Sequence, residues 1–108
     1  MIKIKIMGLL SMLGIGGKPE SIKEYMDKGA VIIDVRTVGE FQNGHIKGSK
    51  NIPLDTISSK VSEIKQLDKP VIVCCQSGMR SAQAASIMKN NGIDVINGGG
   101  WQGLESKL

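Results

Sequence analysis

Short apolar runs alternate with amphipathic segments along most of this chain. The runs are rich in β-branched side chains and apolar on both faces, a pattern typical of strands buried within a sheet. Strands are predicted at 30–35, 71–74 and 93–96, and a short extended piece containing Pro53 at 51–54. The most apolar of them, the run beginning at Val71, is expected at the centre of the sheet.

The segments between these runs have apolar positions at helical spacing. Ser21 with Glu24, and Thr37 with Glu40, have the spacing of a capping box, in which two side chains satisfy the first amides of a helix. Asp55 is a predicted N-cap for the helix that follows it. Helices are expected at 21–29, 37–43, 55–64, 81–91 and 101–104.

Alternating strands and helices predict an α/β fold, with a mainly parallel sheet covered by helices on both faces. The chain has 108 residues, enough for one hydrophobic core but not for two. We therefore place one domain at 18–108, preceded at 1–17 by an apolar tail or short helix. The apolar stretch of this tail is too short to span a bilayer. Two lysines before it resemble the start of a secretory signal, so export is the alternative to a cytoplasmic location.

Composition and charge narrow the possible partners. Hydrophobic residues make up 41% and charged residues 22%, as in an ordinary folded domain. Only 3% of residues are aromatic, which argues against base-stacking platforms for single-stranded nucleic acid. The net charge of +4 comes from scattered lysines, without the dense run typical of a DNA-binding arm or a polybasic membrane patch. We expect a monomer that attracts small anions and binds neither nucleic acid nor metal.

The two cysteines, Cys74 and Cys75, are neighbours in the sequence. Their Cα atoms lie about 3.8 Å apart across a trans peptide. Usual disulfides need roughly 4.4 to 6.8 Å, so two unpaired thiols are expected, which fits a reducing compartment. Cys74 ends an apolar run and is predicted to pack as a small buried hydrophobe, with a resolving thiol as the alternative.

Cys75 stands at the carboxyl end of the predicted central strand, where parallel sheets bind their ligands. It begins the loop CQSGMR, which is followed by a helix. Gly78 is free to adopt a left-handed conformation, so the loop amides and the helix N-terminus would form a nest for anions. The same field lowers the pKa of a thiol. Cys75 is therefore a candidate nucleophile exposed at a strand-to-helix turn.

Several separated segments, in this order along the chain, form a recognisable pattern. They are VIIDVRTVGEF at 31–41, GHIKGSKNIPL at 44–54, VIVCCQSGMRSAQAA at 71–85 and the glycines before Trp101. Together they resemble a single-domain rhodanese over residues 19–104. The resemblance implies the three-layer α/β/α sulfurtransferase fold. It also implies that Cys75 attacks the outer sulfur of thiosulfate or a persulfide donor, becomes a persulfide, and passes the sulfur to cyanide or a thiol.

The resemblance also implies roles for the residues around Cys75. Loop amides would bind the terminal sulfur and the donor's oxyanions, while the Ser77 and Arg80 side chains orient the substrate. The predicted substrate-binding residues are Gln76, Ser77, Gly78, Met79 and Arg80. The predicted supporting residues are Asp34, Arg36, Glu40 and Ser81. No metal or organic cofactor is required, because the persulfide itself carries the sulfur.

Within the supporting group, Asp34, Arg36 and Glu40 are expected to form a network that fixes the loop beside the site, because buried charges need partners. A direct substrate contact by Arg36 is the alternative. His45, a tempting general base, is assigned to hydrogen bonding between loops. Trp101 either covers the mouth of the site or packs on the domain.

Two other functions remain open for the loop. One is phosphoester hydrolysis or arsenate reduction, because related phosphatases use a cysteine thiolate in a similar cradle, but they place five residues between cysteine and arginine. Four residues separate Cys75 from Arg80, a tighter loop that suits a sulfur atom better than a phosphate. The other alternative is a non-enzymatic relay module that receives persulfide sulfur from a partner protein.

Overall fold

The computed structural model describes residues 19–108 of the chain. Its elements, in chain order, are α2 (Pro19–Asp27), β1 (Val31–Asp34), α3 (Val38–Gln42), β2 (Lys50–Asn51), the 3-10 helix η2 (Leu54–Thr56), α4 (Ile57–Gln66), β3 (Val71–Cys75), α5 (Met79–Asn90), β4 (Val95–Gly100) and α6 (Trp101–Glu105). The predicted tail at 1–17 lies outside the described residues.

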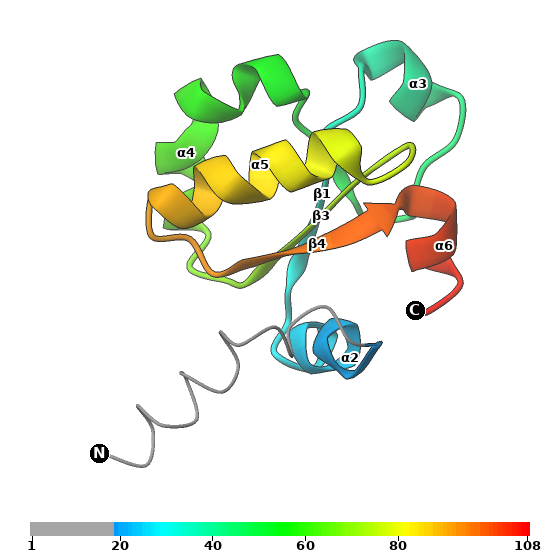
Figure 1. The fold of residues 1–108 in the computed structure, drawn as a ribbon, viewed down its shortest axis with the longest axis horizontal. Helices are drawn as coiled ribbons and strands as arrows, with labels where there is room; N and C mark the ends of the chain where they lie inside the picture. Colours follow the sequence, from blue (N-terminus) through cyan, green and yellow to red (C-terminus); the bar gives the residue numbers. More distant parts are fainter. Residues whose placement is uncertain (1–18) are drawn as a thin grey trace.

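The four strands form one parallel sheet in the order β2-β1-β3-β4. Helices α4 and α5 lie on one side of this sheet, and α2 and α6 lie on the other (Figure 1). The predicted three-layer α/β/α architecture is therefore confirmed. Strand β3 is an inner strand, flanked by β1 and β4, so its carboxyl end lies near the middle of one edge of the sheet.

Each face of the sheet has its own hydrophobic cluster, because successive side chains of a strand point to opposite faces. Val73 and Cys75 of β3 belong to the cluster packed against α4 and α5. Ile72 and Cys74 belong to the cluster packed against α2 and α6. Both faces are buried, which explains why the sequence of β3 is an unbroken apolar run. The two neighbouring cysteines consequently lie on opposite sides of the sheet.

Strand β4 is longer than the sequence predicted. It was expected to end at Ile96, before the three glycines, but it continues to Gly100. Asn97 pairs with Val73, and the next pair joins Gly99 to Cys74, so Gly98 is an extra residue in a β-bulge. The glycines are thus part of the strand beside the predicted nucleophile and not a connecting loop.

The predicted helix starts have mixed outcomes. Thr37 and Glu40 form the expected capping box at the start of α3. Asp55 is not an N-cap: it lies inside η2, and α4 begins at Ile57 without a capping side chain. Ser21 is also not an N-cap, because α2 already begins at Pro19. In both cases the helical segment begins earlier than the amphipathic pattern indicated: α2 at Pro19, and η2 before α4.

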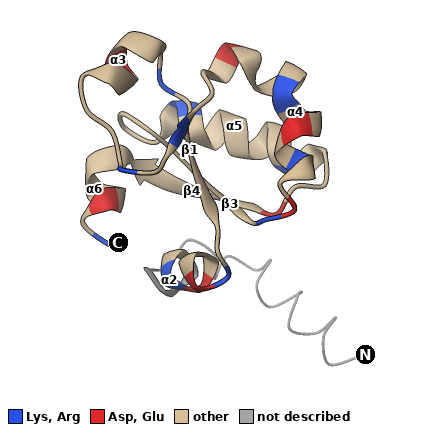
Figure 2. Cartoon of the chain, turned by 180° about the vertical axis from the view of Figure 1, so that it is seen from behind, with Lys and Arg blue, Asp and Glu red and all other residues tan. Residues whose placement is uncertain are grey.

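Acidic and basic side chains are interleaved along α4, where Lys60 pairs with Glu63 (Figure 2). Another exposed pair, Lys23 with Asp27, lies on α2. Within residues 19–108, every helix is too short or too polar to cross a membrane.

Candidate functional site

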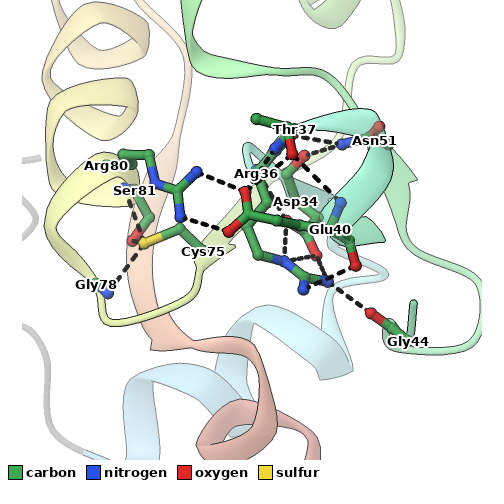
Figure 3. A network of polar contacts seen from close by, with 10 residues as sticks. All are labelled: Asp34, Arg36, Thr37, Glu40, Gly44, Asn51, Cys75, Gly78, Arg80 and Ser81. Atoms are coloured by element: carbon green, nitrogen blue, oxygen red, sulfur yellow. Dashed lines mark hydrogen bonds and ion pairs between the residues drawn. The ribbon is translucent and has the colours of Figure 1, made fainter. Parts of the chain in front are cut away.

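Cys75 is the last residue of β3, and the loop that follows folds back over its sulfur. The backbone amide of Gly78 donates a hydrogen bond to Cys75 Sγ at 2.9 Å, and the amide of Ser81 lies 3.4 Å from the same atom (Figure 3). The Ser81 hydroxyl is also 3.4 Å from the sulfur. Two backbone amides, one from the loop and one from the first turn of α5, therefore face the cysteine sulfur.

The sulfur is less accessible than the sequence suggested. Cys75 was expected to be exposed at the turn, but only 1% of its surface is exposed. The side chain points toward α5 and the loop encloses it, because the alternation of β3 places Cys75 on the α5 face of the sheet. The Cys75 sulfur therefore lies in the interior of the site and not at the open surface.

The pKa of Cys75 lies below the ordinary value of a thiol. Burial raises the pKa, but hydrogen bonds that the sulfur accepts from the backbone amides of Ser81, Gly78 and Ser77 lower it. Cys74 behaves in the opposite way. Burial and the nearby Asp34 carboxylate raise the pKa of Cys74 to about 12. The Cys75 thiol therefore ionises more readily than an ordinary thiol, and the Cys74 thiol stays neutral in the core.

Two glycines allow the loop to close tightly. Gly78 has φ +101°, a left-handed conformation that disfavours other residues. Gly100, at the end of β4, lies directly under the loop: a Cβ atom there would be 2.7 Å from the carbonyl oxygen of Gln76. Because β4 continues through the glycines, its backbone lies directly against the loop, with no side chain between them.

The Arg80 side chain, which was predicted to orient the substrate, pairs with Glu40 in the structure. Its guanidinium forms two hydrogen bonds to the Glu40 carboxylate, at 2.7 and 3.0 Å (Figure 3). The bonds from Arg80, followed by those from the Thr37 cap, lower the pKa of Glu40 to about 2. The pair is partly exposed, and it connects the first turn of α5 to α3.

Asp34 and Arg36 form a second, fully buried pair. Arg36 Nη2 lies 2.7 Å from Asp34 Oδ2, and Arg36 Nε lies 3.0 Å from Asp34 Oδ1. Further donors of Arg36 bind the carbonyl oxygens of Gly44 and Glu40. Asn51, which the sequence analysis did not select, donates to the carbonyl oxygens of Asp34 and Arg36. The expected network thus exists, but it consists of two separate ion pairs linked through the Glu40 backbone.

Trp101 covers part of this network. Its ring lies 4.8 Å from the Arg36 guanidinium carbon, in a cation–π arrangement. Trp101 also packs in the cluster under α2 and α6. A cavity of about 240 Å³ lies between this ring and the loop. The residues lining the cavity are Arg36, Glu40, Asn43, Gln76, Trp101 and Gln102. Trp101 therefore borders the site and packs on the domain at the same time.

The remaining predicted residues are distributed around the loop. Gln76, Ser77 and Met79 are exposed, and 75% of the Met79 surface is accessible. Ser81 is buried under the loop. The His45 ring stacks on Phe41 and contacts the Phe41 carbonyl oxygen, within one segment and not between two loops as predicted.

Asn97 is a second contact residue that the sequence analysis missed. Its side chain bonds to the Ser81 hydroxyl at 2.6 Å and to the Gly78 carbonyl oxygen at 3.1 Å. The signal that would have found it is a polar residue directly after an apolar run, at the carboxyl end of a strand next to the nucleophile. The error in the predicted end of β4 hid this position.

Comparison with known proteins assigns the class of this domain. The family model described as rhodanese-like domain matches residues 18–107. The chain belongs to the rhodanese-like domain family, as the resemblance in the sequence predicted.

Two curated relatives illustrate the range of the family. The chain is 46% identical over 67 residues to the uncharacterized protein YqhL of Bacillus subtilis, covering 62% of this chain and 52% of YqhL. It thus spans about half the length of that relative. It is 35% identical over 78 residues to the thiosulfate sulfurtransferase GlpE of Stutzerimonas stutzeri, covering 72% of this chain and 71% of GlpE.

Solved structures show the same fold. The reduced Bacillus anthracis CoADR-RHD matches with a TM-score of 0.68 and 36% identity, over 82% of this chain and 16% of that protein. The human single-domain sulfurtransferase TSTD1 matches with a TM-score of 0.65 and 26% identity, over 84% of this chain and 94% of TSTD1.

Proposed function

We propose that this protein is a sulfurtransferase that moves a sulfane sulfur from thiosulfate or a persulfide donor to cyanide or a thiol, through a persulfide on Cys75. The observation that supports this most directly is the 2.9 Å contact between the Gly78 amide and Cys75 Sγ, within a loop that encloses the sulfur. The similarity to a protein named thiosulfate sulfurtransferase also supports it.

In the first half-reaction, the Cys75 thiolate attacks the outer sulfur of the donor. A new S–S bond forms, the bond between the two donor sulfurs breaks, and its electron pair leaves with sulfite when thiosulfate is the donor. Cys75 then holds a persulfide anion. The backbone N–H groups that already face Cys75 Sγ donate hydrogen bonds without giving up their protons, so they stabilise this negative charge without a separate acid.

In the second half-reaction, cyanide or a thiolate attacks the terminal sulfur of the persulfide. The S–S bond to Cys75 breaks, and its electron pair returns to Cys75 as a thiolate. Cyanide thereby becomes thiocyanate, and a thiolate becomes a persulfide. Atoms, electrons and charge balance in each half-reaction without an external oxidant or reductant, and the persulfide carries the sulfur, so the proposal includes no metal and no organic cofactor.

Arg80 is proposed to act at the entrance and not at the sulfur, because its guanidinium is bound to Glu40. Gln76 and the exposed Ser77 and Met79 lie where a donor or acceptor would approach. The two unpaired thiols, Cys74 and Cys75, would persist in a reducing compartment, so we place the protein in the cytoplasm.

Intact mass spectrometry tests the proposed function. The protein is incubated with thiosulfate, with an organic persulfide or with a phosphate ester, and half of each sample is then treated with cyanide. We expect the sulfur donors to add the mass of one sulfur atom, cyanide to remove it, and the phosphate ester to leave the mass unchanged. A phosphorylated cysteine, or no adduct with any sulfur donor, would overturn the proposal.

A relay module without its own donor chemistry is the second candidate. A relative from Bacillus subtilis, 38% identical over 72 residues, is named putative sulfur carrier protein YrkF. The burial of Cys75 favours delivery of sulfur by a donor that first opens the loop. Formation of the persulfide with an organic persulfide but not with thiosulfate would favour the relay over thiosulfate sulfurtransferase activity.

A further inference from the structure

Asn97 contacts three parts of the site at once. Its Oδ1 accepts a hydrogen bond from the Ser81 hydroxyl at 2.6 Å and another from the Gly99 amide at 2.9 Å. Its Nδ2 donates to the carbonyl oxygen of Gly78 at 3.1 Å. Asn97 lies in β4 at the bulge, and its side chain reaches both the loop and α5.

The orientation of the Asn97 amide follows from its backbone partners. The Gly99 amide is only a donor, so the atom that faces it must be the oxygen, and the Gly78 carbonyl is only an acceptor, so the atom that faces it must be the NH₂ group. Because Oδ1 carries no proton, the Ser81 hydroxyl must donate in the 2.6 Å contact.

Ser81 has a single hydroxyl proton and two neighbours that compete for it. One is Asn97 Oδ1 at 2.6 Å, and the other is Cys75 Sγ at 3.4 Å. While the proton lies toward Asn97, the hydroxyl oxygen presents lone pairs to the sulfur. Lone pairs accept a hydrogen bond from a thiol but repel a thiolate.

We propose that Asn97 is a positioning residue that restrains the reactivity of Cys75 by holding the Ser81 hydroxyl proton away from the sulfur. This inference rests on the proposed function only in taking Cys75 as the reacting thiol. It adds a residue of β4 to the site. It also means that the direction of the Ser81 hydroxyl proton decides whether Cys75 is favoured as a thiol or as a thiolate.

Charged groups do not provide an alternative control of this proton. Arg80 on α5 is paired with Glu40 on α3, and Arg36 after β1 is paired with Asp34. Substitution of Asn97 leaves both pairs in place. The Gly78 and Ser81 amides that donate to the sulfur are backbone groups and also remain. The Ser81 hydroxyl is thus the group beside the sulfur whose hydrogen-bond direction changes when Asn97 is replaced.

The test is an ultraviolet titration of the thiolate in the full chain. In Asn97→Leu the acceptor is lost, so the Ser81 hydroxyl turns to the sulfur and the Cys75 pKa falls by about one unit, a tenfold rise in thiolate at a pH below the pKa. Cys74, with a pKa of about 12, titrates separately. The measurement uses no sulfur donor, so a normal titration in a protein that fails to form a persulfide would count against the proposed function only.

Two further variants decide whether the effect passes through Ser81. Adding Ser81→Ala to Asn97→Leu should cancel the shift, since no hydroxyl remains to turn. Asn97→Asp keeps an acceptor for Ser81 but loses the donor to Gly78, and its carboxylate adds a negative charge that disfavours the thiolate, so Cys75 should be no more acidic than in the native protein. An unchanged or raised pKa in Asn97→Leu, a shift that survives Ser81→Ala, or an equal fall in Asn97→Asp would each overturn the proposal.

Discussion

Arg80 and Glu40 form a two-pronged ion pair between helices α5 and α3, across 40 positions of sequence. Glu40 Oε1, which accepts from Arg80, also accepts a hydrogen bond from the Thr37 amide at 2.9 Å, as part of the capping box of α3. One glutamate therefore caps its own helix and binds the arginine at the end of the loop. The loop that encloses Cys75 is fixed to the rest of the domain through this carboxylate.

The Glu40 pair predicts a pH dependence of stability. The pKa of Glu40 in the folded protein, about 2, is below the ordinary glutamate value, so its stabilising effect is complete above about pH 4.3 and is lost as the pH falls toward 2. In Glu40→Gln the charge is removed, but the amide still accepts in the capping box. Urea unfolding of both proteins should show a difference in unfolding free energy near neutral pH that shrinks in acid. A difference independent of pH would contradict the role of the charge.

The two cysteines should respond differently to substitution. We expect Cys75→Ser to abolish persulfide formation, because a hydroxyl at this position does not ionise near neutral pH. Cys74→Ser should retain most of the transfer activity, since Cys74 lies on the opposite face of the sheet. It should lose about 1 to 3 kcal/mol of stability through burial of a hydroxyl in an apolar cluster. Assays of thiocyanate formation and denaturant unfolding measure the two effects, and equal loss of activity in both variants would refute this division.

Gly100 is predicted to be necessary for closure of the loop. A methyl group in Gly100→Ala would lie 2.7 Å from the Gln76 carbonyl oxygen, a backbone atom that can move away only if the loop opens. Sulfur transfer should fall at least tenfold while the protein stays folded, because the Gly78 amide moves away from the sulfur. Loss of one hydrogen bond to a charged sulfur corresponds to a change in rate of about tenfold.

Gly103→Ala is the matched control for this variant. Its Cβ would meet nothing within 4 Å, and the position lies inside α6. Alanine should therefore stabilise the helix by about 0.5 to 1 kcal/mol without changing activity. Equal activity of Gly100→Ala and Gly103→Ala would show that the contact under the loop is unimportant.

Removing one partner of the buried Asp34–Arg36 pair should destabilise the protein, because the other partner would remain buried as an unpaired charge. Asp34→Asn leaves the Arg36 guanidinium in a site where only 3% of its surface is exposed. Removal of one partner of such a pair costs about 3 to 5 kcal/mol. Thermal and urea unfolding should both shift accordingly. A loss below about 1 kcal/mol would mean that the carbonyl oxygens of Gly44 and Glu40 alone satisfy the guanidinium.

The sequence predicted the features that depend on near neighbours. The apolar run of β3 indicated a strand buried on both faces, and alternation along it separates Cys74 from Cys75. The spacing of Thr37 and Glu40 predicted a capping box that is present. The left-handed conformation at Gly78 was also predictable, because only the local turn requires it. These features involve residues within one turn of helix or a few positions of a strand, where the chain itself fixes the separation.

Only the tertiary structure decided which groups meet across the domain. The Glu40 carboxylate that pairs with Arg80 belongs to α3, 40 positions away in the sequence. Cys75 was expected to be exposed, but the glycine backbone of β4 lets the loop close over it. Asn97 had no visible role until the bulge in β4 brought it opposite Ser81. Each of these contacts depends on how separate elements pack, and the local periodicity that predicts an element does not specify which neighbour its side chains will find.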